Sequence, residues 1–242
     1  MSTFSVVTMP FAHFLEMAID PEMDAPPTIE DVQEAIADHT GEPASWDEAS
    51  HADHESDAWE LEAHCLFALK AAGAWHALHG TLEGFEVGED PLDHPIWEQI
   101  AEREPDEIMP QLVSSHAWDA AYVPVAIDGL VETTWNTPED EDGYVLLVGS
   151  LPALAAELEL LAGPLGLEGL EEPAEDAVFD EEADPLAAVK YAFYVLGSEV
   201  RRAIEIGLPL FVVYDGEEDD EDGEGHDHEG HDHAGHDHGD LN

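Results

Sequence analysis

Acidic side chains dominate this chain of 242 residues, which holds 59 Asp and Glu against 5 Lys and Arg, a formal net charge of −54. A field of this sign repels phosphate, which argues against a nucleic-acid-binding surface and against binding to an anionic membrane. The hydrophobic content of 44% and aromatic content of 8% are those of a globular protein, so the acidity does not by itself indicate disorder. The length suits one large domain or two small ones with a sizeable core.

The acidity extends along the whole chain. From Asp215 onward there are 13 acidic residues and no Lys or Arg, which leaves 46 acidic and 5 basic residues before that point. Three explanations fit this excess: a solvated surface that provides solubility, for example in a salty cytoplasm, an interaction face for a basic partner protein, and loose binding of cations by carboxylate clusters. Composition alone does not separate them.

The first residues lack the positively charged and apolar segments of a signal peptide, and no apolar run is long enough to span a membrane. The single cysteine, Cys65, cannot form an internal disulfide, and its place on an apolar stripe predicts a buried structural thiol. We therefore expect a cytoplasmic protein without a membrane span.

Hydrophobic periodicity predicts an α+β fold over residues 1–214, a single compact domain in which several helices pack with a small sheet. Acidic, polar insertions interrupt the pattern near 42–57 and 163–183. The expected strands are residues 3–7, 144–148 and 209–214. The expected helices begin at Pro10, Thr28, Asp57, Ile96, Ser150 and Asp184-Pro185.

The sequence also predicts how several elements end. Thr28 and Asp31 form the pattern of a capping box, and Gly41 and Gly207 are expected to stop the helices before them. The helix expected from Asp57 to Leu82 should break or bend at Gly73, before Trp75. Residues 105–137 are ambiguous. Within them Tyr122–Ile127 is a strand candidate, and Pro124 would restrict that strand to a sheet edge.

The end of the chain carries a repeated motif. Gly-His-Asp-His occurs three times at a spacing of five residues. Imidazole nitrogens are good ligands for Zn, Ni, Co and Cu, and the interleaved Asp residues add oxygen donors. Residues 215–242 cannot build a core, so we expect a disordered acidic and His-rich tail that binds these metals. The expected ligands are His226, His228, His231, His233, His236 and His238.

Ligands that are not held in place bind at an ordering cost and without strong selectivity, which suits metal buffering or storage better than catalysis. An expression tag is the competing explanation, although tags are usually uninterrupted histidine runs. His51, His54 and His64 also lie near carboxylates, and a solvated polar linker explains them more simply. No cofactor is expected for residues 1–214.

Catalytic residues are not specified by any motif. The patterns of a nucleophile elbow, a phosphate-binding loop, a dinucleotide fold or a zinc protease do not occur in the sequence. We therefore expect a protein that is not an enzyme. The enzyme alternative would need His79, with His76 and a carboxylate from the loop at 84–95, to line a pocket.

A more specific pattern, Trp-x-x-Leu-His-x-x-Leu-x-Gly followed by Asp-Pro-Leu at 90–92, is made by Trp75, Leu78, His79, Leu82 and Gly84. It resembles the core signature of the YfbM-like family of bacterial proteins of unknown function, and the order of the predicted elements is similar over most of residues 1–214. The resemblance implies a compact α+β domain and no known reaction. Residue chemistry alone predicts that the Trp and both Leu are core, and that His79 is partly buried and hydrogen-bonded to the following loop.

Two functional hypotheses follow. The first is a non-enzymatic binding protein of unknown physiological role whose C-terminal repeats bind divalent transition metals. The alternative is an acidic immunity or inhibitor protein that neutralises a basic partner protein, with an association rate that falls as salt screens the complementary fields. In neither hypothesis is a nucleic acid or a membrane the ligand.

Overall fold

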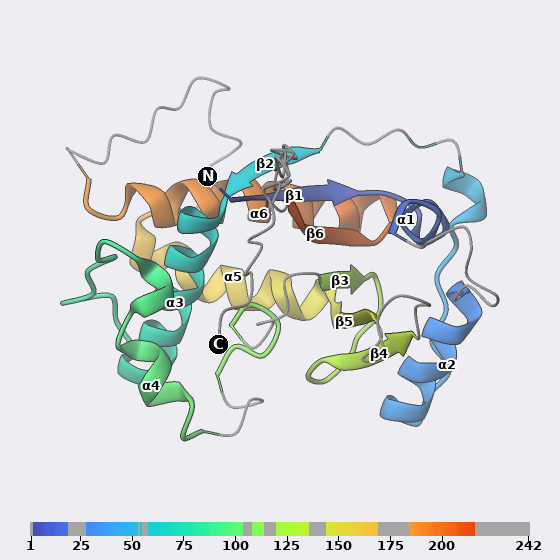
Figure 1. The fold of residues 1–242 in the computed structure, drawn as a ribbon, viewed down its shortest axis with the longest axis horizontal. Coiled ribbons are helices and arrows are strands. Elements are labelled where there is room, and N and C mark those ends of the chain that lie inside the picture. Colours follow the sequence, from blue (N-terminus) through green and yellow to red (C-terminus); the bar gives the residue numbers. More distant parts are fainter. Residues whose placement is uncertain are drawn as a thin grey trace, which may run out of the picture.

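The computed structural model describes residues 2–18, 28–52, 54, 58–103, 108–113, 120–135, 144–168 and 184–215. Within them a six-stranded mixed sheet lies between helices on both of its faces, which confirms the predicted α+β class (Figure 1). The six histidines of the tail, from His226 to His238, lie outside the described residues.

The strands follow one another along the chain as β1 (Thr3–Thr8), β2 (Trp59–Glu62), β3 (Ala120–Val123), β4 (Val131–Trp135), β5 (Tyr144–Ser150) and β6 (Leu210–Asp215). Their order in the sheet is β2-β1-β6-β3-β5-β4. Neighbouring strands are antiparallel except β3 and β5, which are parallel. The last described strand, β6, lies inside the sheet between β1 and β3. The sheet is therefore complete only when residues 210–215 have paired with both of these strands.

Alternate residues of the strands face two separate cores, as the twofold period of a strand requires. In β6, Leu210 and Val212 face a core made with α3 (Ala63–His79), α5 (Leu151–Leu165) and α6 (Ala187–Ile206). Phe211, between them, faces the core made with α1 (Phe11–Ala18) and α2 (Ile29–Thr40), where its ring stacks on Phe14 at a centroid distance of 4.2 Å. Two helical layers therefore cover opposite faces of one sheet.

The capping signals correctly predicted where α2 and α6 begin or end. The hydroxyl oxygen of Thr28 accepts a hydrogen bond from the backbone N–H of Asp31 at 3.3 Å, and the backbone N–H of Thr28 donates to the Asp31 carboxylate at 2.7 Å. Gly41 follows α2 with φ 74°, a left-handed conformation that glycine adopts without a steric cost. Gly207 ends α6 in the same way.

The helix predicted from Asp57 to Leu82 is wrong over its first part. Trp59 and Leu61 lie in β2, because this segment pairs with β1 in an antiparallel register. A break at Gly73 does not occur, since α3 continues through it. A Cβ on Gly73 would lie 3.0 Å from Leu112 Cδ2, so the glycine allows the segment 108–113 to approach the helix closely.

The strand predicted at Tyr122–Ile127 is shorter and differently placed. It is β3, which begins at Ala120 and ends at Val123, and it lies inside the sheet between β6 and β5. Pro124 follows the last paired residue, so its missing N–H costs no bond and imposes no edge position. α4 (Ile96–Ile100) lies where the sequence predicted a short helix.

The insertions are only partly described. At the first, Glu48 is tied to α1, because its carboxylate accepts from the backbone N–H of Phe11 at 2.8 Å and from the Trp46 indole. At the second, α5 extends to Leu165, and residues 169–183 lie outside the described part. No helix in the described ranges is both long and apolar enough to cross a membrane.

Candidate protein-interaction surface

The basic residues gather on one side of the sheet. Lys70 lies on α3, and Lys190, Arg201 and Arg202 lie on α6. Burial lowers the pKa of Lys70 to about 8, and its ammonium lies 5.6 Å from the centre of the Phe67 ring. The Lys190 ammonium is 2.6 Å from the Asp184 carboxylate. Of the five bases, only Arg103 lies outside this layer.

The three helices of this layer have no formal net charge when histidine is counted as neutral. Their acidic residues are Glu157 and Glu159 on α5 and Glu199 and Glu205 on α6, which equal in number the four bases. Glu157 and Glu199 are buried, so they present little charge to solvent. The α3–α5–α6 layer therefore contributes little to the negative field around the protein.

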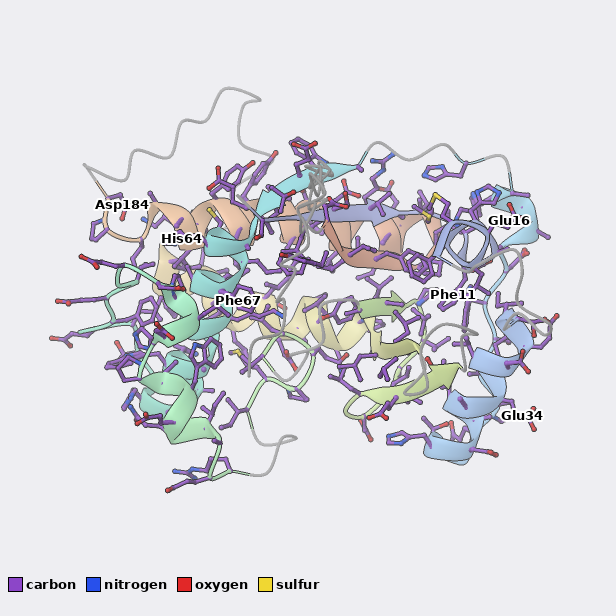
Figure 2. All side chains as sticks on the ribbon, viewed as in Figure 1. Phe11, Glu16, Glu34, His64, Phe67 and Asp184 are labelled. Carbon is purple, nitrogen blue, oxygen red and sulfur yellow. The ribbon has the colours of Figure 1, made fainter. Side chains whose placement is uncertain are left out.

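The opposite face of the sheet is different. Helices α1 and α2 carry five acidic residues and no Lys or Arg, and all five side chains are exposed. Figure 2 shows Glu34 on the outer side of α2, at one end of the longest axis of the molecule. The exposed acids of this layer are Glu16, Glu30, Asp31, Glu34 and Asp38.

Three of these acids form a regular line, here called the α2 row: Glu30, Glu34 and Asp38. They are four residues apart, which places each about 6 Å further along the helix axis than the last. Val32 and Ile36, on the other side of the helix, are fully buried against the sheet. The row thus points away from the core while the helix that carries it is fixed to the sheet.

The helix start adds a further charge. Hydrogen bonds from the Thr28 hydroxyl and backbone N–H lower the pKa of Asp31 below its ordinary value, so this carboxylate is ionised at neutral pH. At the other end of the helix, His39 Nε2 lies 3.1 Å from the backbone oxygen of Asp128, which ties α2 to the turn before β4. Both ends of the acidic helix are therefore held in place.

A second acidic segment, here called the 83–102 arc, follows α3 and runs through α4 at the other end of the longest axis (Figure 1). Its seven acids are all exposed: Glu83, Glu86, Glu89, Asp90, Asp93, Glu98 and Glu102. Its histidine, His94, fixes the loop, because its Nδ1 accepts from the backbone N–H of Ile96 at 3.0 Å. Nε2 must then carry the proton, and it donates to the backbone oxygen of Glu86 at 3.2 Å.

The residues of the sequence pattern support this arc. Leu82 is buried, Leu78 is partly buried, and Gly84 has φ 82°. The Trp75 ring is partly buried and packs against Phe85 at a centroid distance of 6.0 Å. The prediction for His79 is wrong: its side chain is exposed, and its ring packs on Trp75 at 4.3 Å. The histidine that binds the loop is His94, which lies just before Pro95 and the start of α4 at Ile96 and contacts the backbone of Glu86 and Ile96.

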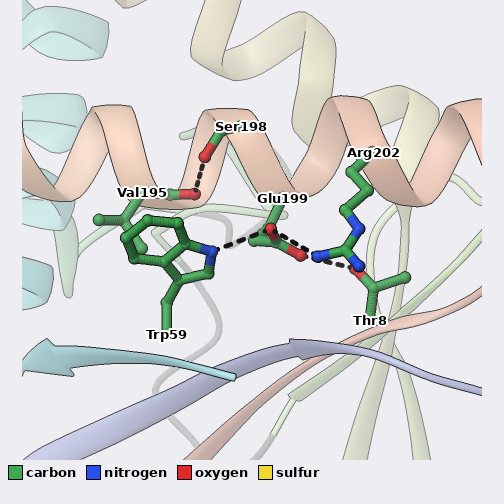
Figure 3. A network of polar contacts seen from close by, with 6 residues as sticks. All are labelled: Thr8, Trp59, Val195, Ser198, Glu199 and Arg202. Atoms are coloured by element: carbon green, nitrogen blue, oxygen red, sulfur yellow. Dashed lines mark hydrogen bonds and ion pairs between the residues drawn. The ribbon is translucent and has the colours of Figure 1, made fainter. Parts of the chain in front are cut away.

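Two buried carboxylates were missed by sequence reasoning. Glu199 accepts hydrogen bonds from the Thr8 hydroxyl at 3.0 Å and the Trp59 indole at 3.1 Å, and lies 3.5 Å from the Arg202 guanidinium (Figure 3). Glu157 accepts from the backbone N–H groups of Gln111 and Leu112. The sequence offered one sign of their burial, because Glu157 directly precedes the apolar residue Leu158 and Glu199 directly precedes Val200. Both act as structural anchors.

The structure brings together no metal centre from the candidate ligands that it describes. His51 lies in a short turn, His64 lies in the first turn of α3, and no group of three or more His, Cys, Asp or Glu side chains within the described ranges is arranged to hold an ion. Cys65 is buried, as its position on the apolar stripe predicted.

Comparison with known proteins gives one finding. A protein-family model described as "Putative DNA-mimic protein" matches residues 3–212, which include every helix and nearly every strand of the fold. No curated protein and no solved structure matches the chain. The resemblance to the YfbM-like family stays a prediction. With most of its length matched, the chain belongs to the family of putative DNA-mimic proteins.

Proposed function

We propose that this protein is a non-enzymatic DNA mimic, a cytoplasmic protein that occupies the DNA-binding surface of a basic partner protein. Membership of the family supports the proposal. The structural observation that carries it is the uneven charge of the helices that cover the sheet, because α1 and α2 carry exposed acids and no bases while α3, α5 and α6 together are formally neutral. The proposal follows the hypothesis of an acidic inhibitor that neutralises a basic partner protein, and it narrows that partner to a protein that binds DNA.

The physical basis is shared with DNA itself. A protein that binds DNA presents Lys and Arg side chains to phosphates, and most of its sequence-independent affinity comes from that charge complementarity. Carboxylates on a fixed backbone can occupy the positions of the phosphates, although the protein has no nucleobases or sugars. The mimic and DNA are both negatively charged, so they repel each other. Because both bind the same basic surface of the partner, they compete for it.

Solubility alone is a weaker explanation for this arrangement. Any scattered excess of acid keeps a protein soluble. It does not require that four of five bases be collected on the helices of one layer while the described helices of the other layer carry none. A face that must meet a cationic protein does require this, because a base placed there would repel the partner.

An affinity experiment tests the proposal. The full-length chain is immobilised, an extract of the source cells is passed over it at low salt, and bound proteins are eluted with a short DNA duplex. A column of polyglutamate serves as the control for charge alone. We expect a DNA-binding protein that the chain retains, that duplex DNA releases, and that polyglutamate retains poorly. If the retained proteins do not bind DNA, or if the duplex does not release them, the proposal fails.

We propose separately that the three Gly-His-Asp-His repeats bind transition-metal ions, because their six imidazoles alternate with carboxylates. Titration of zinc or nickel into the full chain and into a 1–214 truncation tests this. We expect several sites of moderate affinity in the full chain that the truncation lacks. Equal stoichiometry in both would contradict the assignment.

A further inference from the structure

We infer that the partner docks on the outer face of α2, through the α2 row, and not on the 83–102 arc or on the α3–α5–α6 layer. This inference rests on the proposed function, because it names the surface that performs the mimicry. The occupant to which it commits is the Lys- and Arg-lined DNA-binding surface of a basic protein. Three separate features of α2 support it.

The first feature is that α2 is a fixed element whose outer acidic side chains are exposed among the described residues. Its inner side chains Val32 and Ile36 are fully buried, its start is held by the capping box, and its end is tied to Asp128 through His39. A partner therefore meets carboxylates whose backbone is already in place. Preorganised charges lose less conformational entropy on binding than charges on a loop do.

The second feature is the density of charge. α2 has 12 residues, so it is about 18 Å long and carries four exposed acids, or one carboxylate per about 4.5 Å of axis. One strand of DNA carries one phosphate per about 3.4 Å of helix axis. The helix as a whole therefore approaches the charge density of one DNA strand, and the three acids of the α2 row follow one side of it at a spacing of about 6 Å.

The third feature is that the row opposes the stability of its own helix. Acids of the same sign four residues apart repel each other, and Asp38 in the last turn lies near the negative end of the helix dipole. The helix would be more stable with neutral side chains at Glu34 and Asp38. A binding role explains why repulsive charges lie where the fold does not need them.

The 83–102 arc fits the same partner less well. Most of it lies outside helices, so its carboxylates are less preorganised than those of α2. Arg103 follows it directly and His94 lies within it. The arc nevertheless holds seven exposed acids against three in the α2 row, so three of its acids can be neutralised as a control of equal charge.

Two matched variants of the full-length chain test the inference. The first, E30Q/E34Q/D38N, neutralises the α2 row, and the second, E83Q/E86Q/E89Q, neutralises three exposed acids of the arc. Both change the net charge equally, so they weaken long-range attraction equally. The probe is the purified protein that duplex DNA elutes from the immobilised wild-type chain, and the readout is its dissociation constant for each variant.

We expect the α2 variant to bind about ten- to a hundredfold more weakly than wild type and the arc variant to change affinity by less than about threefold. The α2 variant should melt at or slightly above the wild-type temperature, because it removes repulsion within the helix and leaves the capping box intact. Equal losses in both variants, or a larger loss in the arc variant, would overturn the inference and leave the proposed function standing. Failure of wild type to retain any protein that DNA displaces would overturn both.

Discussion

Glu157 joins the segment 108–113 to α5 through hydrogen bonds to Gln111 and Leu112. Because its carboxyl group is buried, its protonation makes the stability of the fold depend on pH. The two backbone N–H groups that it binds favour the ionised form, but the loss of water outweighs them and raises its pKa to about 6, from an ordinary value of 4.5. The folded protein therefore keeps a proton that the unfolded chain has lost across this interval. Its contribution to the free energy of unfolding is full below about pH 4.5 and is lost as the pH rises through 6.

Comparison of wild type with E157Q isolates this effect, because the titration of the other carboxylates is common to both proteins. From pH 7 to pH 4.5, the free energy of unfolding of wild type should rise relative to that of the variant by about 2 kcal/mol. Chemical denaturation at a series of pH values measures it. Parallel curves for the two proteins would show that Glu157 keeps an ordinary pKa in the folded state.

Gly149 illustrates a constraint imposed by contact alone. A Cβ at this position in β5 would overlap Gln111 Oε1 and would lie 2.8 Å from the Tyr122 ring. The same Gln111 oxygen accepts from the backbone N–H of Ser150 at 2.7 Å, so it cannot move away without breaking a buried hydrogen bond. Gly197 in α6 is the opposite case, because a Cβ there would meet only Arg201 Nη1, at 4.0 Å.

The two glycines should therefore respond oppositely to the same change. Gly149→Ala is expected to lower the free energy of unfolding by about 1–3 kcal/mol through overpacking. Gly197→Ala is expected to raise it by about 0.5–1 kcal/mol, because alanine loses less backbone entropy in a helix. Urea denaturation of both variants measures the difference. Equal effects would mean that Gly149 has room that the structure does not show.

At the scale of elements, β2 is a four-residue edge strand whose attachment depends on α6. Its Trp59 indole donates to Glu199, the buried carboxylate that also accepts from Thr8 in β1 (Figure 3). The variant W59F removes this indole donor while it keeps an aromatic ring, and it should cost about 1–2 kcal/mol. Amide hydrogen exchange should quicken in β2 and stay unchanged in β5. Unchanged exchange in β2 would contradict an anchoring role for Glu199.

Local signals in the sequence predicted the elements that depend on neighbouring residues. The capping box at Thr28, the hydroxyl cap at Ser150 and the left-handed Gly207 each act within one turn, so each could be identified without tertiary contacts. β2 and β4 could not be identified in this way, and the candidate strand Tyr122–Ile127 only overlaps β3. The apolar spacing of Leu61 continues into α3, and only pairing with β1 makes it a strand.

The sequence predicted that the candidate surface would be acidic, but it did not predict which elements of the fold would carry it. The charge count indicates a basic partner as one of three explanations, yet it cannot show on which side of the sheet each residue lies. Four bases are spread from Lys70 to Arg202 along the chain, and they become one layer only because α3 and α6 pack on the same face. That grouping is a tertiary fact, so the α2 row could not be distinguished from the arc by composition.

At the scale of the whole molecule, a formal net charge of −54 makes the compact state repel itself. Monovalent salt screens this repulsion more in the folded protein than in the expanded unfolded chain. The melting temperature of the full chain should therefore rise from low to high sodium chloride. The effect should be smaller in a variant with six neutralised acids, three in the α2 row and three in the arc. A melting temperature that falls with salt would indicate that attractive ion pairs dominate instead.

Mutual exclusion between this protein and DNA is the central claim, and sedimentation measures it directly. The purified partner is mixed with a labelled short duplex, and the full chain is then added in increasing amounts. The account predicts that the labelled duplex leaves the partner as the chain binds, so that only the two binary complexes occur. A ternary complex containing the partner, the duplex and the chain would contradict it, because a DNA mimic and DNA cannot occupy one surface together.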